Sequence, residues 1–279
     1  MYKQAYSSLV AIAIIGMFLS LIILAFSMHS IPSNPIFFIV LLSLLGILAL
    51  GMMYRYICIP FLFATFFVLS VLRILGLHKC FVPMIPVIIS LLCLVILFLY
   101  IAYHDVKRQP IILQGKSHDM FEMSAYEWHL SFIRIYVGFD LIAHCTEKLF
   151  AGRIPFQADV TAFMHLNVVD PSFFVRFSGL CELAGVISLG LGLLTRMGAL
   201  GTSLYLIVAA LIGHHFLKGF IWALPGGGWE YPVMWSVFIL SYIVLGADEF
   251  SIDGVLDKNF NLPIWLKRLM GVMESDGKI

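Results

Sequence analysis

The chain has 279 residues, of which 61% are hydrophobic and only 12% are charged, and its mean hydropathy is +1.00. Soluble domains contain about 25% charged residues, so this composition favours an integral membrane protein. The net charge of +1 gives no reason to expect nucleic acid as a partner. The composition therefore predicts a chain whose main partner is membrane lipid.

Apolar segments long enough to cross a bilayer as helices recur along the whole chain. The predicted spans are 8–27, 36–54, 57–76, 83–103, 131–150, 173–194, 198–216 and 231–247. No A-x-A cleavage pattern follows the first apolar run, so we interpret it as a retained helix rather than a signal peptide. The expected fold class is an all-α integral membrane protein with about eight transmembrane helices.

Polar stretches divide the chain into four predicted regions. They are an N-terminal four-helix membrane region at 1–104, a polar cytoplasmic connector at 105–130, a second four-helix membrane domain at 131–253, and a cytoplasmic tail at 254–279. The tail is expected to hold an interfacial amphipathic helix, with Pro263 as its first residue and Trp265 opposite Lys267.

The 17 Lys and Arg residues are distributed unevenly between the two sides of the predicted membrane domain. The larger share falls on the side of the two termini. Loops rich in Lys and Arg stay on the cytoplasmic side of membranes. We therefore expect both termini to be cytoplasmic.

The two halves of the chain differ in where they place ionisable side chains. In the first half, cations such as Arg55 and Arg73 fall near predicted helix ends, which is typical of side chains that reach the lipid headgroups. In the second half, ionisable groups lie within the spans. Such a group costs about 2.5–3.5 kcal/mol at bilayer depth and usually faces a protein interior or a water-filled cavity.

The predicted fifth span carries the most charge. The segment RIYVGFDLIAHCTEKL, at 134–149, contains Arg134, Asp140, His144, Glu147 and Lys148. At 100° per residue, Asp140, His144 and Lys148 share one face of a continuous helix. This pattern indicates a functional face directed into the protein.

The predicted sixth span places Glu182 among several glycines, which let helix backbones approach closely. A carboxylate in that setting should pair with a cation or stay protonated. Arg134, His144 and Lys148 are the expected partners. Convergence of these groups predicts a site that binds a ligand or moves protons, and the alternative is an ion pair that only fixes helix packing.

The end of the predicted seventh span and the turn after it hold further candidates. His215 follows another histidine, but no His-x-x-x-His pair is present, so no metal site is expected. Gly227 and Gly228 allow turns with positive φ and a close backbone approach. Glu230 could face the same cavity mouth as Lys148 and His215, and the alternative is a plain turn before the last span.

The five cysteines form no C-x-x-C motif and show no metal-ligand spacing. We interpret them as small buried apolar side chains. A redox role for Cys145 and Cys181 is the alternative.

Four ordered motifs between about Phe132 and Asp253 resemble those of the DoxX family of small four-helix membrane proteins. The motifs are Arg134, Gly138, His144, Lys148 and Leu149 in the predicted fifth span, ELAGVISLGLGLLTR at 182–196, His215 with GF and GGWEY up to Tyr231, and GADEFSID at 246–253. The chain departs from the family pattern at Cys145, Val186 and Ala247, and Asp140 is not part of it.

The resemblance implies a C-terminal DoxX-like four-helix bundle in a bacterial inner membrane, acting as a quinone-linked redox subunit of the thiol or thiosulfate to quinone type. The candidate catalytic residues, which would relay protons, are Glu182, Glu147 and His144. The candidate ligand-binding residues are Arg134, Asp140, Lys148, His215, Gly227, Gly228 and Glu230.

The sequence has no haem, flavin, iron–sulfur or NAD motif. Electrons would therefore have to come from a substrate thiol or from a soluble or membrane oxidoreductase subunit. Two hypotheses stay open: a quinone-dependent oxidoreductase subunit, and a non-enzymatic small-molecule transporter or membrane scaffold for redox partners. The sequence does not specify the oligomeric state.

Overall fold

The computed structural model describes residues 2–27, 33–113, 116–118 and 121–272. Its contacts divide the chain into two units. Unit 1 takes in Met1–Phe132 and Ile142–Gln157, and unit 2 takes in Ile133–Leu141 and Ala158–Ile279. Residues 114–115 and 119–120 of the predicted connector, and 273–279 of the predicted tail, lie outside the described residues.

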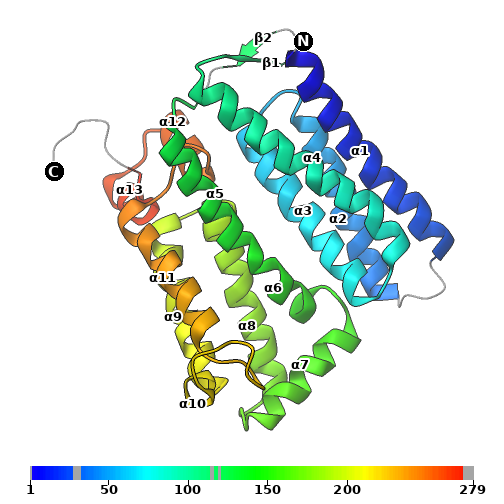
Figure 1. The fold of residues 1–279 in the computed structure, drawn as a ribbon, viewed down its shortest axis with the longest axis vertical. Helices are drawn as coiled ribbons and strands as arrows, with labels where there is room; N and C mark the ends of the chain where they lie inside the picture. Colours follow the sequence, from blue (N-terminus) through cyan, green and yellow to red (C-terminus); the bar gives the residue numbers. More distant parts are fainter. Residues whose placement is uncertain (1, 28–32, 114–115, 119–120, 273–279) are drawn as a thin grey trace. The chain divides into compact units, whose positions relative to one another are not determined.

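Four long helices make up most of unit 1 (Figure 1). They are α1 (Tyr2–Ser27), α2 (Ser33–Met52), α3 (Cys58–Leu77) and α4 (Phe81–Val106). α1 packs against α4 and α2, and α3 packs against α2 and α4. The backbones of α1 and α4 approach closely at Gly16, where an added Cβ would lie 2.6 Å from the carbonyl oxygen of Pro86. The Ser90 hydroxyl donates to the carbonyl of Ala13 at 2.9 Å and so links the same two helices.

The connector after α4 is folded onto the end of that helix. A short hairpin pairs β1 (Ile111–Leu113) with β2 (Lys116–His118) in antiparallel register. Asp105 is fully buried and accepts hydrogen bonds from the backbone N–H of Met123 at 2.9 Å and from Nε1 of Trp128 at 2.8 Å. These bonds satisfy the buried carboxylate, so Asp105 anchors the connector within unit 1.

The predicted fifth span is interrupted in the structure. α5 (Ala125–Asp140) ends one residue before Leu141, and α6 (Ile142–Leu149) follows directly, packing against α3. α5 begins with a capping box, in which Ser124 and Glu127 exchange hydrogen bonds between side chain and backbone. Because the helix breaks at Leu141, the expected single face carrying Asp140, His144 and Lys148 is not formed by one continuous helix.

Unit 2 is a second helical bundle. Its elements are most of α7 (Arg153–His165), α8 (Pro171–Gly185), the π-helical turn η2 (Val186–Gly190), α9 (Thr195–Ile212), α10 (His215–Lys218), α11 (Glu230–Leu245), α12 (Ile252–Asn259) and α13 (Ile264–Met270). α9 packs against α8 and α11. Asp170 caps α8 by accepting from the N–H of Phe173, and Pro171 stands in the first turn, where a missing N–H costs nothing. The core contains Val137, Leu189, Ala199, Ile239 and Tyr242.

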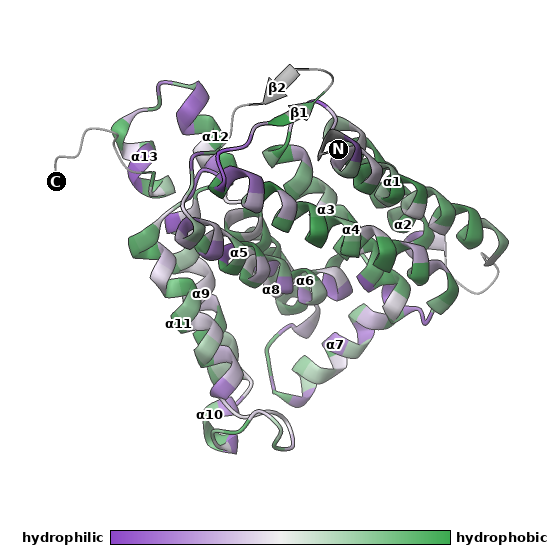
Figure 2. Ribbon diagram, turned by 45° about the horizontal axis from the view of Figure 1, so that its top comes forward, coloured by the Kyte–Doolittle hydropathy of each residue, from purple (hydrophilic) through white to green (hydrophobic). Residues whose placement is uncertain are grey.

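Within the described residues, six helices are long and apolar enough to cross a membrane. They are Gln4–Phe26, Ser33–Met52, Cys58–Leu77, Phe81–Val106, Pro171–Gly190 and Thr195–Ile212. α11 is apolar but shorter, and Figure 2 shows how hydrophobic residues dominate α1–α4. These helices expose large side chains such as Ile15 and Leu99 while burying Ser43 and Ser90, which is the arrangement expected of helices in lipid. The expected class, an all-α multi-pass membrane protein, is confirmed.

The predicted tail helix is present, with one difference at its start. α13 begins at Ile264, and Pro263 occupies the cap position instead of the first helical position. Met270 is buried against the bundle, whereas Trp265 is exposed. Lys267 pairs with Asp257 at 2.8 Å, which fixes α13 to α12.

Candidate functional site

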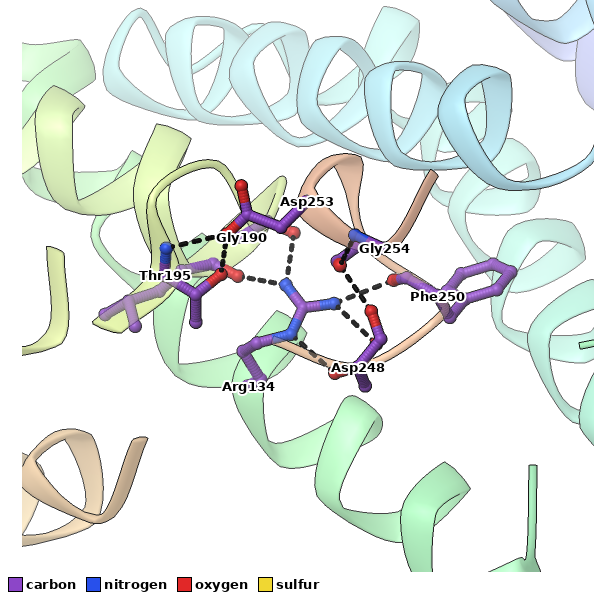
Figure 3. A network of polar contacts seen from close by, with 9 residues as sticks. Arg134, Gly190, Thr195, Asp248, Phe250, Asp253 and Gly254 are labelled. Atoms are coloured by element: carbon purple, nitrogen blue, oxygen red, sulfur yellow. Dashed lines mark hydrogen bonds and ion pairs between the residues drawn. The ribbon is translucent and has the colours of Figure 1, made fainter. Parts of the chain in front are cut away.

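Arg134 lies at the centre of a polar network in unit 2 (Figure 3). Its side chain is fully buried. Nε and Nη2 donate to the two carboxylate oxygens of Asp248 at 2.8 and 3.3 Å, and Nη2 also donates to the carbonyl of Phe250 at 2.8 Å. Nη1 donates to the carbonyl of Leu189 and, at 3.5 Å, to that of Gly190.

These contacts engage every N–H of the guanidinium, which has five donors in a fixed plane. The residue therefore ties α5 to the end of η2 and to the segment after α11. These contacts of Arg134 are to Asp248 and to backbone carbonyls, and they give it a structural role; ligand binding by Arg134 stays a prediction.

Asp253 completes the same network. Its carboxylate accepts from the backbone N–H groups of Leu194 and Thr195 at 2.9 and 2.8 Å, and from the Thr195 hydroxyl at 2.9 Å. Its own N–H donates to the carbonyl of Gly192, which has a φ of +73°. Burial raises the pKa of the Asp253 carboxyl, while its hydrogen bonds and the charge of Arg134 oppose that rise. Asp253 thus caps α9 and holds the turn that precedes it.

Gly138 explains how closely α5 can approach η2. A Cβ added there would lie 2.1 Å from the backbone nitrogen of Gly190, a separation that no side chain can occupy. This contact is at the same end of unit 2 as Arg134 and its carbonyl partners. Arg134, Gly138 and Asp253, three residues of the family-like motifs, therefore lie together at this end of unit 2. We call this cluster the Arg134 network.

Glu182 and Tyr205 form a separate polar pair in the interior of unit 2. Glu182 is only 5% exposed, and the Tyr205 hydroxyl donates to its Oε1 at 2.6 Å. The pair joins α8 to α9, one turn before the π-helical segment begins at Val186. π-Helical turns occur frequently at functional sites. The sequence singled out Glu182 but missed Tyr205 as its partner.

His144, Glu147 and Lys148 belong to unit 1. Arg73 donates to Glu147 Oε2 at 2.6 Å and to the carbonyl of Ala143 at 3.1 Å. His144 Nδ1 lies 3.7 Å from Glu147 Oε1, and Lys148 donates to the carbonyl of His144 at 3.3 Å. Arg73 is therefore an ion-pair partner, contrary to the expectation that it reaches the lipid headgroups. A common site of these residues with Glu182 stays a prediction.

The glycine-rich turn brings together four of the predicted ligand-binding residues. His215 Nδ1 is 2.8 Å from the carbonyl of Gly227, which has a φ of +77°. A Cβ on Gly228 would meet three backbone carbonyl oxygens at 2.4–2.6 Å. Glu230 Oε2 accepts from the N–H of Trp222 at 3.1 Å. These contacts hold the chain in a compact turn before α11.

Asp140 lies at the end of α5 and is half-buried. The Tyr231 hydroxyl donates to its Oδ2 at 3.5 Å. The predicted ligand-binding residues of unit 2 therefore occupy distinct places. Arg134 lies in its hydrogen-bond network, Asp140 lies beside Tyr231, and His215 lies with Glu230 in the turn.

The described part of the chain contains neither a disulfide bond nor a cluster of side chains suited to a metal ion. No disulfide joins the five cysteines there, and no group of three or more His, Cys, Asp or Glu side chains could hold a metal ion. Cys145 is fully buried in unit 1, and Cys181 is partly buried in unit 2 beside Glu182.

The spans and the buried network define a multi-pass helical membrane protein whose second unit contains the Arg134 network. The chain belongs to the DoxX family, whose model matches residues 129–215. An uncharacterized protein of Haemophilus influenzae is 30% identical over 126 residues, which are 45% of this chain and 89% of that protein. No solved structure matches the chain. The family match ends at His215, so α1–α4 and the segment from Phe216 onward lie outside it.

Proposed function

We propose that this DoxX-family protein is a quinone-linked redox subunit that passes electrons from a thiol or thiosulfate donor to a quinone. The observation that supports this role is the buried pair of Glu182 and Tyr205, joined at 2.6 Å within the apolar helices of unit 2. Quinone reduction needs protons at membrane depth, and a carboxyl group there can hold and transfer one.

The overall reaction balances with a thiol as donor. Two thiols lose two electrons and two protons as an S–S bond forms, and the quinone gains two electrons and two protons to become a quinol. In this proposal Glu182 holds a proton for a quinone oxygen, and the Tyr205 hydroxyl orients the carboxyl group. The acid and the phenol also fit a quinone chemically, because its carbonyl oxygens accept hydrogen bonds.

His144 and Glu147 are the second set of proposed proton carriers, placed in unit 1 beside Arg73. A soluble or membrane oxidoreductase subunit is the proposed source of electrons when no free thiol or thiosulfate serves. The proposed location is a bacterial inner membrane with both termini in the cytoplasm, as the distribution of Lys and Arg predicts.

The test measures quinone binding and quinone-dependent oxidation of thiols and thiosulfate by the purified full chain in lipid nanodiscs. Glu182→Gln should lower the oxidation rate by about 10²–10⁴-fold, the usual contribution of a positioned acid or base. Asp170→Asn is the matched control, because it removes the same charge at an exposed helix cap where Asn serves equally well.

Absence of quinone binding, or an oxidation rate that is indifferent to Glu182→Gln, would contradict the proposal. Uptake of a solute by proteoliposomes without any quinone-dependent oxidation would favour the transporter hypothesis instead. Co-purification with a soluble oxidoreductase, again without activity of the chain itself, would favour the scaffold hypothesis.

A further inference from the structure

Asp140 is a half-buried carboxylate that lacks the arginine partner found beside two other carboxylates of the protein. Asp248 and Glu147 each bind an arginine. Among the described residues, Asp140 forms no ion pair, and its hydrogen bond from the Tyr231 hydroxyl is long, at 3.5 Å. An ionised carboxylate can accept about four hydrogen bonds, so most of the capacity of Asp140 is unused.

Aromatic rings from three segments of unit 2 cluster with Tyr231, the hydrogen-bond partner of Asp140. The ring of Tyr231 lies 5.6 Å from that of Trp235 and 5.3 Å from that of Trp222. Tyr136, one turn before Asp140 on α5, lies 5.8 Å from Trp235. Tyr136 is 54% and Trp222 is 44% exposed, so ring surface stays accessible within this aromatic cluster.

The basic side chains of the neighbouring turn are engaged elsewhere. Lys218 donates to the carbonyls of Gly213 and Gly226 at 2.8 and 2.9 Å, and His215 contacts the carbonyl of Gly227. Glu230, bonded to the N–H of Trp222, adds a second carboxylate to this end of unit 2. The aromatic cluster that contains the hydrogen-bond partner of Asp140 therefore also carries a second carboxylate, bonded to the backbone of Trp222.

Aromatic faces attract cations, and the attraction grows when the cation is desolvated. A carboxylate that forms no ion pair within the described part of the chain strengthens that preference. Ring surfaces beside it favour a cation with apolar substituents over a small hydrated ion. We propose that Asp140 and Tyr231, with the rings of Tyr136, Trp222 and Trp235, form a binding site for a lipophilic organic cation.

This site shares no residue with the pair of Glu182 and Tyr205 and does not depend on the proposed redox function. Asp140 is also not part of the family-like motif. Binding of an organic cation here would give the protein a ligand, or a transported solute, that its redox role does not require.

The test uses tetraphenylphosphonium as the probe and tetraphenylborate as an anion of the same shape. Binding of each to the purified full chain in nanodiscs is measured by equilibrium dialysis. We expect saturable binding of the cation only. Asp140→Asn should weaken it about tenfold or more, and Trp222→Leu, at an exposed position, about three- to tenfold, in line with the loss of one carboxylate or one ring.

Three matched variants separate this site from general effects. Asp140→Glu should retain binding within about threefold, because it keeps the charge. Asp170→Asn should leave binding unchanged, and so should Glu182→Gln, which tests the redox proposal independently. Equal binding of the anion, no saturable binding of the cation, or unchanged binding in both Asp140→Asn and Trp222→Leu overturns the proposal.

Discussion

Each unit of the protein contains an arginine–carboxylate pair that joins segments distant in the sequence. In unit 2, Arg134 binds Asp248, with side-chain exposures of 0% and 14%. In unit 1, Arg73 binds Glu147, with exposures of 37% and 19%. The two pairs use the same functional groups in different surroundings.

The difference shows what a buried ion pair contributes. Arg134 has all its N–H groups engaged, so its carbonyl partners and Asp248 depend on one side chain. Removing one member of such a buried pair leaves uncompensated charge and is strongly destabilising. The side chain of Arg73 is partly exposed, and Glu147 also has His144 nearby, so this pair can change its partner at lower cost.

Replacing the buried arginine should have the largest effect on stability. Arg134→Lys keeps the charge but presents its donors from a single nitrogen, which cannot reach Asp248 and the carbonyls on both sides. We expect a loss of about 3–5 kcal/mol in the free energy of unfolding. The measurement is equilibrium unfolding by sodium dodecyl sulfate in mixed micelles, followed by circular dichroism.

The matched control for that substitution is Arg73→Lys, with an expected loss below about 1 kcal/mol. Equal losses in the two variants would show that burial does not distinguish the pairs.

Gly138→Ala tests whether the Arg134 network in unit 2 depends on the close approach of the α5 and η2 backbones. The added methyl group would meet the backbone of Gly190, which cannot move aside like a flexible side chain. We expect a loss of about 3 kcal/mol, at the upper end of overpacking effects. Gly201→Ala on α9 is the control, since an added Cβ there meets nothing within 4 Å and should be neutral or slightly stabilising. A neutral Gly138→Ala variant would argue against the α5–η2 contact.

The sequence predicts most of the fold because apolar length is a local property. Six predicted spans correspond to helices that satisfy both length and hydropathy, and the last predicted span corresponds to the shorter α11. The interruption at Leu141 was not predicted. That segment has neither glycine nor proline at the break, so helical periodicity alone extends the helix through it.

The sequence identifies charged residues better than it pairs them. Arg134 and Glu182 stand out because each is ionisable within an apolar span. Their partners, Asp248 and Tyr205, lie 114 and 23 residues away in the chain, and periodicity carries no information about such contacts. Asp248 does fall within the GADEFSID motif, which is the one signal that could have indicated its role.

Asp253→Asn sharpens the comparison between the two units, because it removes a charge from the Arg134 network while keeping the shape of the side chain. One oxygen becomes an NH₂ group that faces a donor, either the N–H of Leu194 or the groups of Thr195. An unsatisfied buried donor costs about 1–3 kcal/mol, so we expect a loss near 2 kcal/mol by the same unfolding measurement. Thr195→Val, which removes only the hydroxyl donor, should cost less. The reverse order would mean that the backbone bonds to Asp253 contribute little.

The smallest expected effect belongs to the pair in unit 1. A double-mutant cycle with Arg73→Ala and Glu147→Ala should give a coupling energy of about 0.5–1 kcal/mol, because both side chains are partly exposed. Added salt should lower this coupling, since solvent-exposed charges are screened. A coupling above about 3 kcal/mol that does not respond to salt would make the pair of Arg73 and Glu147 equivalent to the buried pair. The energetic difference between the buried ion pair of unit 2 and the partly exposed ion pair of unit 1 would then be disproved.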